Sequence, residues 1–249
     1  MKGFVFCDID GCLNLHKNTP FDLPRLMQVR ELVPQLAAKG VGFALCTGRP
    51  QPYAEAMAQL LGLETPLVCE GGAMVYEPLG DNYRPMASAD SVRAITALQA
   101  DLQASGLLRD TLYFEVGNAY SLCLTGPAIS GQSQTGIRAQ MERLKAQYAD
   151  YPVSWSHSTT SIDITPVDIN KGSGLRAICA DYNVPLARTA GIGDSNGDVG
   201  MFQTTARGYC PDNASDELKL LAAYVSAHRY TEGTLDILNV IAADASLYE

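Results

Sequence analysis

The sequence is poor in basic residues and has no long hydrophobic run. Its 18 lysines and arginines stand against 27 aspartates and glutamates, which gives a net charge of −9. Because nucleic acids and anionic membrane surfaces attract basic proteins, this deficit argues against either as a partner. No stretch approaches the roughly 20 apolar residues that a membrane-spanning helix needs. An anionic ligand would need a local group of basic residues or backbone N–H donors, since the electrostatic field of the negatively charged protein repels it.

Paired cysteines are also missing. None of the seven cysteines stands in a CxxC pair or in a zinc-type cluster with histidine, and the three histidines are scattered. Several cysteines lie inside apolar runs, where cysteine behaves as a small hydrophobic residue. The first apolar run is too short for a signal peptide. We therefore expect a reduced, cytoplasmic protein.

Short apolar runs alternate with helical segments toward both ends of the chain. The run GFVFC at residues 3–7 is rich in strand-forming residues and suits a strand that is buried on both faces. The alternation predicts a doubly wound, Rossmann-like α/β core with a parallel sheet. The predicted core elements lie at residues 3–7, 23–40, 41–48, 52–63, 66–76, 171–184, 189–202, 206–214 and 215–227.

The middle of the chain has a different order, which is helix, two strands, helix, two strands. This order predicts a small α+β unit with an antiparallel sheet and two helices, inserted into the core. We assign residues 1–83 and 167–249 to the core and residues 84–166 to the inserted domain. The elements of the insertion are expected at 88–106, 111–125, 134–151 and 153–166.

Acidic side chains stand at the ends of several predicted strands. Asp8 and Asp10 follow the first strand, and Asp194 and Asp198 follow a strand late in the chain. Ligands of a doubly wound sheet bind beyond the carboxyl ends of its strands, so these acids are expected at one mouth. Two carboxylates about 4 Å apart repel by ~4 kcal/mol at an effective dielectric constant near 20, and protons or a cation must neutralise them. Oxygen ligands favour Mg²⁺, which also accepts a phosphate oxygen, and this predicts a magnesium and phosphoryl site.

Four motifs occur in a fixed order along the chain. They are DIDGCL at residues 8–13, Thr47 in LCTGRP, Lys171 in DINKGSG, and GDSNGD at residues 193–198. Each one is weak alone, and each stands at a predicted strand end or helix start. Together they resemble the haloacid dehalogenase-like superfamily of phosphotransferases, and the resemblance covers nearly the whole chain.

The resemblance implies a role for each motif residue. Asp8 would be the nucleophile that forms an aspartyl-phosphate, Asp10 the general acid and base, and Lys171 the partner of Asp8 and of the phosphate. Asp198 would bind the metal, either directly or through water, or orient Lys171 instead. The implied phosphate-binding positions are Thr47, Gly48, Arg49, Lys171 and Asn213, with a surface ion pair as the alternative for Arg49. The implied Mg²⁺ positions are Asp8, Asp10 through its backbone carbonyl, Asp194 and Asp198.

The place of the insertion implies a C2B-type cap, and the C-terminal part most resembles archaeal-type phosphoglycolate phosphatases and sucrose-phosphate phosphatase-like proteins. In EGGAMVY at residues 70–76, Gly71 stands where such proteins usually carry asparagine. A plain hairpin turn is an equal interpretation of this segment. The resemblance leaves the substrate, the cap residues that select it and the oligomeric state open.

Three functions are compatible with these residues. The first is a magnesium-dependent phosphatase of a small phosphorylated metabolite, either phosphoglycolate or a sugar phosphate. A phosphomannomutase-like phosphomutase is the second, although the short cap favours hydrolysis. A non-catalytic metabolite-binding protein is the third, and the complete set of chemical positions argues against it. Taken singly, Asp8 and Asp10 could also be a solvated strand end.

Overall fold

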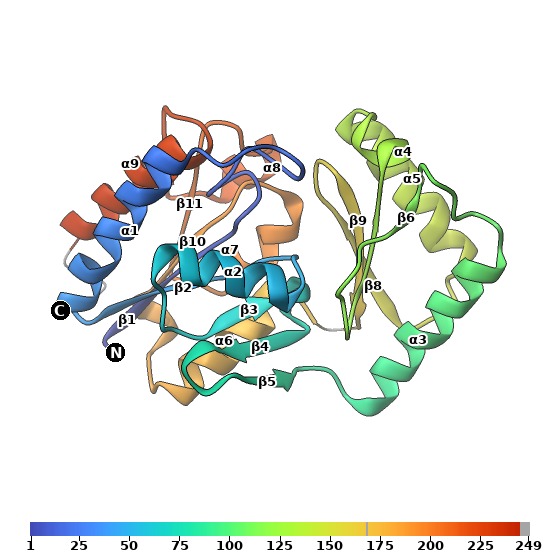
Figure 1. Ribbon diagram of the computed structural model, residues 1–249, viewed down its shortest axis with the longest axis horizontal. Coiled ribbons are helices and arrows are strands. Elements are labelled where there is room, and N and C mark those ends of the chain that lie inside the picture. The colour runs from blue at the N-terminus through green and yellow to red at the C-terminus, as the bar shows by residue number, and fades with distance from the viewer. Residues whose placement is uncertain (168, 245–249) are drawn as a thin grey trace.

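The computed structural model describes residues 1–167 and 169–244. Figure 1 shows a layered α/β core beside a smaller domain, whose sheet faces the core and whose helices lie on its outer side. The core sheet has the strand order β12-β11-β10-β1-β2, and its neighbouring strands are parallel. This confirms the predicted Rossmann-like core. Its strands are β1 (Gly3–Cys7), β2 (Val41–Leu45), β10 (Thr189–Ile192), β11 (Arg207–Cys210) and β12 (Tyr224–Val225).

Alternate side chains of β1 enter two separate apolar cores, one on each face of the sheet. Val5 and Cys7 join one core, and Phe4 and Phe6 join the other. Because both faces of the strand are buried, its sequence is a continuous apolar run. Helices α1 (Leu23–Ala38), α2 (Gln51–Leu61) and α9 (Tyr230–Ala243) cover the first face, and α6 (Lys171–Asp181), α7 (Val199–Phe202) and α8 (Asp216–Leu221) cover the second.

An antiparallel ribbon extends the core beyond β2. A parallel bridge between Cys46 and Val68 attaches it to the end of that strand. The predicted strand, turn and strand over residues 66–76 are confirmed. The third strand of the ribbon has no signal in the sequence, because its side chains are exposed and show no apolar alternation. The ribbon consists of β3 (Leu67–Cys69), β4 (Met74–Glu77) and β5 (Asn82–Pro85).

The inserted domain has the predicted antiparallel sheet and the two predicted helices, and a short third helix at Pro127–Ser130 that the sequence pattern does not predict. Its antiparallel sheet has the order β6-β7-β9-β8, and an apolar core lies between one face of this sheet and the helices. The boundaries at residues 84 and 166 stay a prediction, and Arg84 lies within β5. The strands are β6 (Tyr113–Phe114), β7 (Leu122–Thr125), β8 (Val153–His157) and β9 (Ser161–Pro166), and the helices are α3 (Ala89–Ala104), α4 (Pro127–Ser130) and α5 (Gln134–Gln147).

Two general expectations can be compared with the structure. All seven cysteines are buried and free. Within the described ranges, no helix combines the length and the apolar character that crossing a membrane requires. The cytoplasmic location stays a prediction.

Glu70 joins the core to the inserted domain. Its buried carboxylate, at the end of β3, accepts hydrogen bonds from the backbone N–H groups of Ala119, Tyr120 and Ser121 at 2.8–3.0 Å. The Ser121 hydroxyl donates another at 3.1 Å. Burial raises the pKa of Glu70, while these hydrogen bonds act in the opposite direction. One core side chain therefore fixes the position of the loop that leads into β7.

Replacing Glu70 by glutamine removes one acceptor oxygen and places an amide donor against backbone donors. We expect Glu70→Gln to lower the free energy of unfolding by about 1–3 kcal/mol. The melting temperature should fall at roughly 2–4 °C per kcal/mol. Glu64→Gln is the matched control, because Glu64 is exposed. Equal melting temperatures for the two variants in a calorimetric scan would contradict this role of Glu70.

Candidate active site

One cavity of about 260 Å³ is lined by residues of the core and of the inserted domain. Asp8, Thr47, Lys171 and Asp194 line it, although they are far apart in the sequence. They meet because the parallel strands β1, β2 and β10 end at the same edge of the sheet. Of the other predicted site residues, Asp10, Gly48 and Arg49 also line the cavity.

Asp8 is held at the end of β1 by two contacts. Its Oδ1 accepts a hydrogen bond from the backbone N–H of Ile9 at 2.8 Å, and its Oδ2 lies 2.9 Å from Lys171 Nζ. Burial raises the pKa of the Asp8 carboxyl to about 7, and Lys171 acts in the opposite direction. The carboxylate is therefore oriented, largely dehydrated and in contact with a cation, which are favourable conditions for a nucleophile.

Lys171 begins α6, where Asn170 and Ser173 form a capping box. Its buried ammonium group lies between two carboxylates, at 2.9 Å from Asp8 and 2.6 Å from Asp198. Burial alone lowers the pKa of a lysine, but here Asp198 and Asp8 raise it well above its usual value. Lys171 therefore stays charged at the bottom of the cavity.

Asp198 is fully buried, and both of its oxygens have partners. Oδ1 accepts from Lys171, and Oδ2 accepts from the backbone N–H groups of Asp194 and Ser195 at 3.0 Å each. These contacts favour the alternative in which Asp198 orients Lys171 and shapes the loop that carries Asp194. Direct metal binding by Asp198 stays a prediction.

The glycine of the DIDGCL motif is required by the approach of Asp194. Gly11 has a φ of +81°, and a Cβ added there would lie 2.0 Å from Asp194 Oδ2. A side chain at residue 11 would therefore collide with the carboxylate as well as strain the backbone. Because Gly11 has no side chain, the Asp194 carboxylate can lie directly against the loop after β1.

Asp8, Asp194 and Asp198 form a group that can hold a cation. Each offers one carboxylate oxygen, these oxygens lie within 4.8 Å of one another, and all three side chains are buried. Burial raises the pKa of Asp194 well above its usual value, and the charges of Asp198 and Asp8 act in the same direction. Lys171 alone cannot balance three buried carboxylates. An oxygen-only donor set with this excess of negative charge fits a divalent cation such as Mg²⁺.

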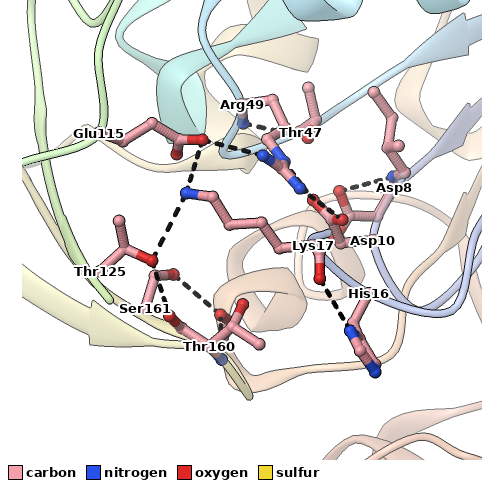
Figure 2. A network of polar contacts seen from close by, with 12 residues as sticks. Asp8, Asp10, His16, Lys17, Thr47, Arg49, Glu115, Thr125, Thr160 and Ser161 are labelled. Atoms are coloured by element: carbon pink, nitrogen blue, oxygen red, sulfur yellow. Dashed lines mark hydrogen bonds and ion pairs between the residues drawn. The ribbon is translucent and has the colours of Figure 1, made fainter. Parts of the chain in front are cut away.

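The Asp10 carboxyl group points toward Arg49 (Figure 2). Arg49 Nε and one terminal nitrogen donate to the two Asp10 oxygens at 2.5 and 2.9 Å. The other terminal nitrogen donates to Glu115 at 2.8 Å. The Arg49 side chain is buried, so the ion pair that the sequence analysis places at the surface lies inside the cavity. A contact of Arg49 with phosphate stays a prediction.

Thr47 and Gly48 follow β2 at the wall of the cavity. The Thr47 hydroxyl accepts a hydrogen bond from the Arg49 backbone N–H at 3.1 Å, and the Thr47 carbonyl accepts one from Gly71 at 3.0 Å. Apart from the neighbours of Gly48 in the chain, no described residue has an atom within 4 Å of the position where a Cβ of Gly48 would be. This open backbone is suited to an anion, but the phosphate-binding role of both residues stays a prediction. Gly71 has a φ of +65° in the short turn between β3 and β4, as the hairpin interpretation expects.

Asn213 has contacts that serve the structure of the core. Its Nδ2 donates to the Gly11 carbonyl at 2.9 Å, and its Oδ1 accepts from the Tyr230 backbone N–H at 2.7 Å. The side chain thus ties the loop after β1 to the start of α9. These contacts indicate that Asn213 holds the backbone at Gly11 in position. A contact of Asn213 with phosphate stays a prediction.

Lys17 and Glu115 belong to the site but have no motif in the sequence. Lys17 reaches from the core to the inserted domain, where its Nζ lies 2.7 Å from Glu115 and 3.5 Å from the Thr125 hydroxyl (Figure 2). Glu115 thereby contacts both Lys17 and Arg49. These contacts depend on how the two domains face each other, and a single sequence carries little signal for them.

The sequence profile of the haloacid dehalogenase-like hydrolases matches residues 5–123 and 128–238, which is most of the chain. The protein belongs to this family. The match confirms the resemblance noted from the four motifs, and it makes the protein a hydrolase by family. It does not assign a substrate or a role to any residue.

Curated relatives of similar length carry phosphatase names. A phosphoglycolate phosphatase of Thermoplasma volcanium is 25% identical over 236 residues, covering 93% of this chain and 95% of the relative. The 5-amino-6-(5-phospho-D-ribitylamino)uracil phosphatase YitU of Bacillus subtilis is 24% identical, covering 94% of this chain and 95% of the relative. The chain is thus similar in sequence to phosphatases whose named substrates differ.

Solved structures support the fold. The sucrose-phosphatase of Synechocystis, solved with sucrose and phosphate, superposes with a TM-score of 0.69 at 20% identity and covers 96% of this chain and 97% of that one. A Thermoplasma acidophilum protein gives a TM-score of 0.71 at 18% identity, with 96% and 98% covered. At this identity the likeness concerns the fold alone.

The carboxylate group predicts that Mg²⁺ stabilises the protein. We expect a higher melting temperature in Mg²⁺ than in EDTA, because a cation at about 100 times its dissociation constant contributes ~2.7 kcal/mol. Asp194→Asn should raise the melting temperature in EDTA, since it removes a buried like charge, and should reduce the increment from Mg²⁺. The exposed Asp110 provides the control Asp110→Asn, which should match the wild type in both buffers. An unchanged increment in Asp194→Asn would exclude this metal site.

Proposed function

We propose that the protein is a magnesium-dependent phosphatase that hydrolyses the phosphate ester of a small metabolite through an aspartyl-phosphate. The observation that carries this proposal is the contact of the buried Asp8 with Lys171 at 2.9 Å, beside Asp194 and in the same cavity as Asp10. The residues proposed as nucleophile, cation, metal ligand and acid–base group thus all line one cavity. The phosphatase names of the relatives support the same chemistry.

In the first step, an Asp8 oxygen attacks phosphorus, and the bond between phosphorus and the leaving oxygen breaks. The leaving alcohol takes the proton of Asp10. Lys171 keeps its charge throughout and offsets the negative charge that accumulates around the phosphoryl group. Asp8 and Asp194 would hold Mg²⁺, which would further neutralise the negative charge at the site.

In the second step, Asp10 accepts a proton from water, and the water oxygen attacks the aspartyl-phosphate. The Asp8 carboxylate is regenerated and inorganic phosphate leaves. Arg49 donates two hydrogen bonds to the Asp10 carboxyl group and so holds it in place within the cavity.

The expected substrate is a small phosphorylated metabolite, because the cavity is closed on one side by the inserted domain. The named substrates of the relatives differ, so they do not choose between phosphoglycolate and other esters. The free cysteines support the proposed cytoplasmic location, where thiols stay reduced.

The nucleophile is tested with Asp8→Asn and para-nitrophenyl phosphate in the presence of Mg²⁺. We expect kcat to fall by at least roughly a thousandfold, because the amide is a poor nucleophile. A cooperative thermal transition of the variant shows that it is folded. Turnover that survives this substitution, or that persists in EDTA, would exclude the proposed mechanism.

The second step is tested with Asp10→Asn. An aryl leaving group departs without an acid, but water still needs a base, so phosphorylated enzyme should accumulate. Quenched mass spectrometry should find the added phosphoryl group on Asp8. A phosphomutase would instead isomerise a hexose 1-phosphate, given a bisphosphate activator, without net phosphate release. That outcome would replace the phosphatase proposal.

A further inference from the structure

The inserted sheet presents a face of small polar side chains to the cavity. Along β8 and β9, alternate residues are polar and line the cavity, whereas Ile162 and Ile164 enter the apolar core on the helix side. Trp155 packs against that core and also lines the cavity. Because strand residues alternate between faces, one face of these strands is mainly polar. The polar positions are Ser154, Ser156, Ser161, Asp163 and Thr165 on the strands, and Ser158 in the turn between them.

Two carboxylates stand in the middle of this face. Asp163 is paired in register with Ser156 on one side and with Cys123 on the other. Glu115 lies next in the same row, since its backbone N–H donates to the Cys123 carbonyl at 2.8 Å. Asp163 accepts a hydrogen bond from the Ser161 hydroxyl at 2.9 Å. The face of the inserted sheet that lines the cavity is therefore rich in hydroxyl groups and carries two carboxyl groups.

The basic side chains of the cavity are already paired with carboxylates of the protein. Among the described residues that line it, these are Lys17, Arg49 and Lys171. Lys17 contacts Glu115, Arg49 contacts Asp10 and Glu115, and Lys171 contacts Asp8 and Asp198. A substrate carboxylate would have to displace one of these partners to reach a basic side chain, whereas a neutral group would not have to displace any of them.

We propose that the cap selects a neutral, polyhydroxylated leaving group, such as a sugar or polyol, and disfavours a leaving group with a carboxylate. In this arrangement, which rests on the proposed function, Asp163 accepts hydrogen bonds from substrate hydroxyls. The surrounding serine and threonine hydroxyls donate and accept further ones. A carboxylate is a strong acceptor for hydroxyl groups, and small neighbours leave room for them. The inference departs from the phosphoglycolate named for several relatives.

The test compares kcat/KM for glucitol 6-phosphate, phosphoglycolate and para-nitrophenyl phosphate, each with Mg²⁺. The wild type should hydrolyse glucitol 6-phosphate with a kcat/KM at least tenfold above that for phosphoglycolate. Asp163→Asn should lower the ratio of glucitol 6-phosphate to para-nitrophenyl phosphate at least tenfold. Asp110→Asn, an exposed change of the same kind in the inserted domain, should leave that ratio unchanged.

A second variant guards against a folding defect. Ser156→Ala removes only a hydroxyl from the residue paired with Asp163, and it should lower the same ratio by a smaller factor while the melting temperature stays constant. A wild type that prefers phosphoglycolate, or ratios that do not change in either variant, would overturn the selection of hydroxyl groups. If para-nitrophenyl phosphate is not hydrolysed at all, the proposed phosphatase function fails instead.

Discussion

The buried contact of Lys171 with Asp8 and Asp198 is the interaction on which the rest of the site depends. It connects the start of α6 with the end of β1 and with the turn at Asn196–Asp198 that follows β10, although β1 and β10 are far apart in the sequence. Three charged groups leave water here, and each would be costly alone. Their mutual neutralisation makes the arrangement tolerable, and the remaining negative charge creates the demand for a cation. The same buried charges thus hold these segments together and create the site for a cation.

Much of this arrangement could be predicted from the sequence because its causes are local. The apolar run of β1 predicts a buried strand, and acids directly after strands must lie at the carboxyl edge of a parallel sheet. Asp8, Lys171 and Asp194 accordingly meet at one cavity. The four motifs also predict which residues carry the charged groups of the site. They do not predict which group each of these residues contacts. Asp198 illustrates this, because its spacing fits a metal ligand while its contacts fit an orienting role.

Other features could not be predicted because they depend on the placement of two domains. Lys17 and Glu115 are ordinary charged residues in the sequence, and only the packing of the inserted domain brings them to 2.7 Å. The exposed β5 has no apolar alternation from which it could be recognised. The polar alternation along β8 and β9 is visible in the sequence, but without the orientation of the sheet it does not indicate which side faces the site.

The way Glu70 holds the inserted domain affects how such a protein can diverge. Three of its four hydrogen bonds come from the main chain, which every non-proline residue provides. The exposed side chain of Ala119 can therefore change without loss of these hydrogen bonds, whereas Tyr120 also packs against the apolar core. Related proteins can therefore differ in the residues of the inserted domain that line the cavity and still keep this attachment of the inserted domain to the core.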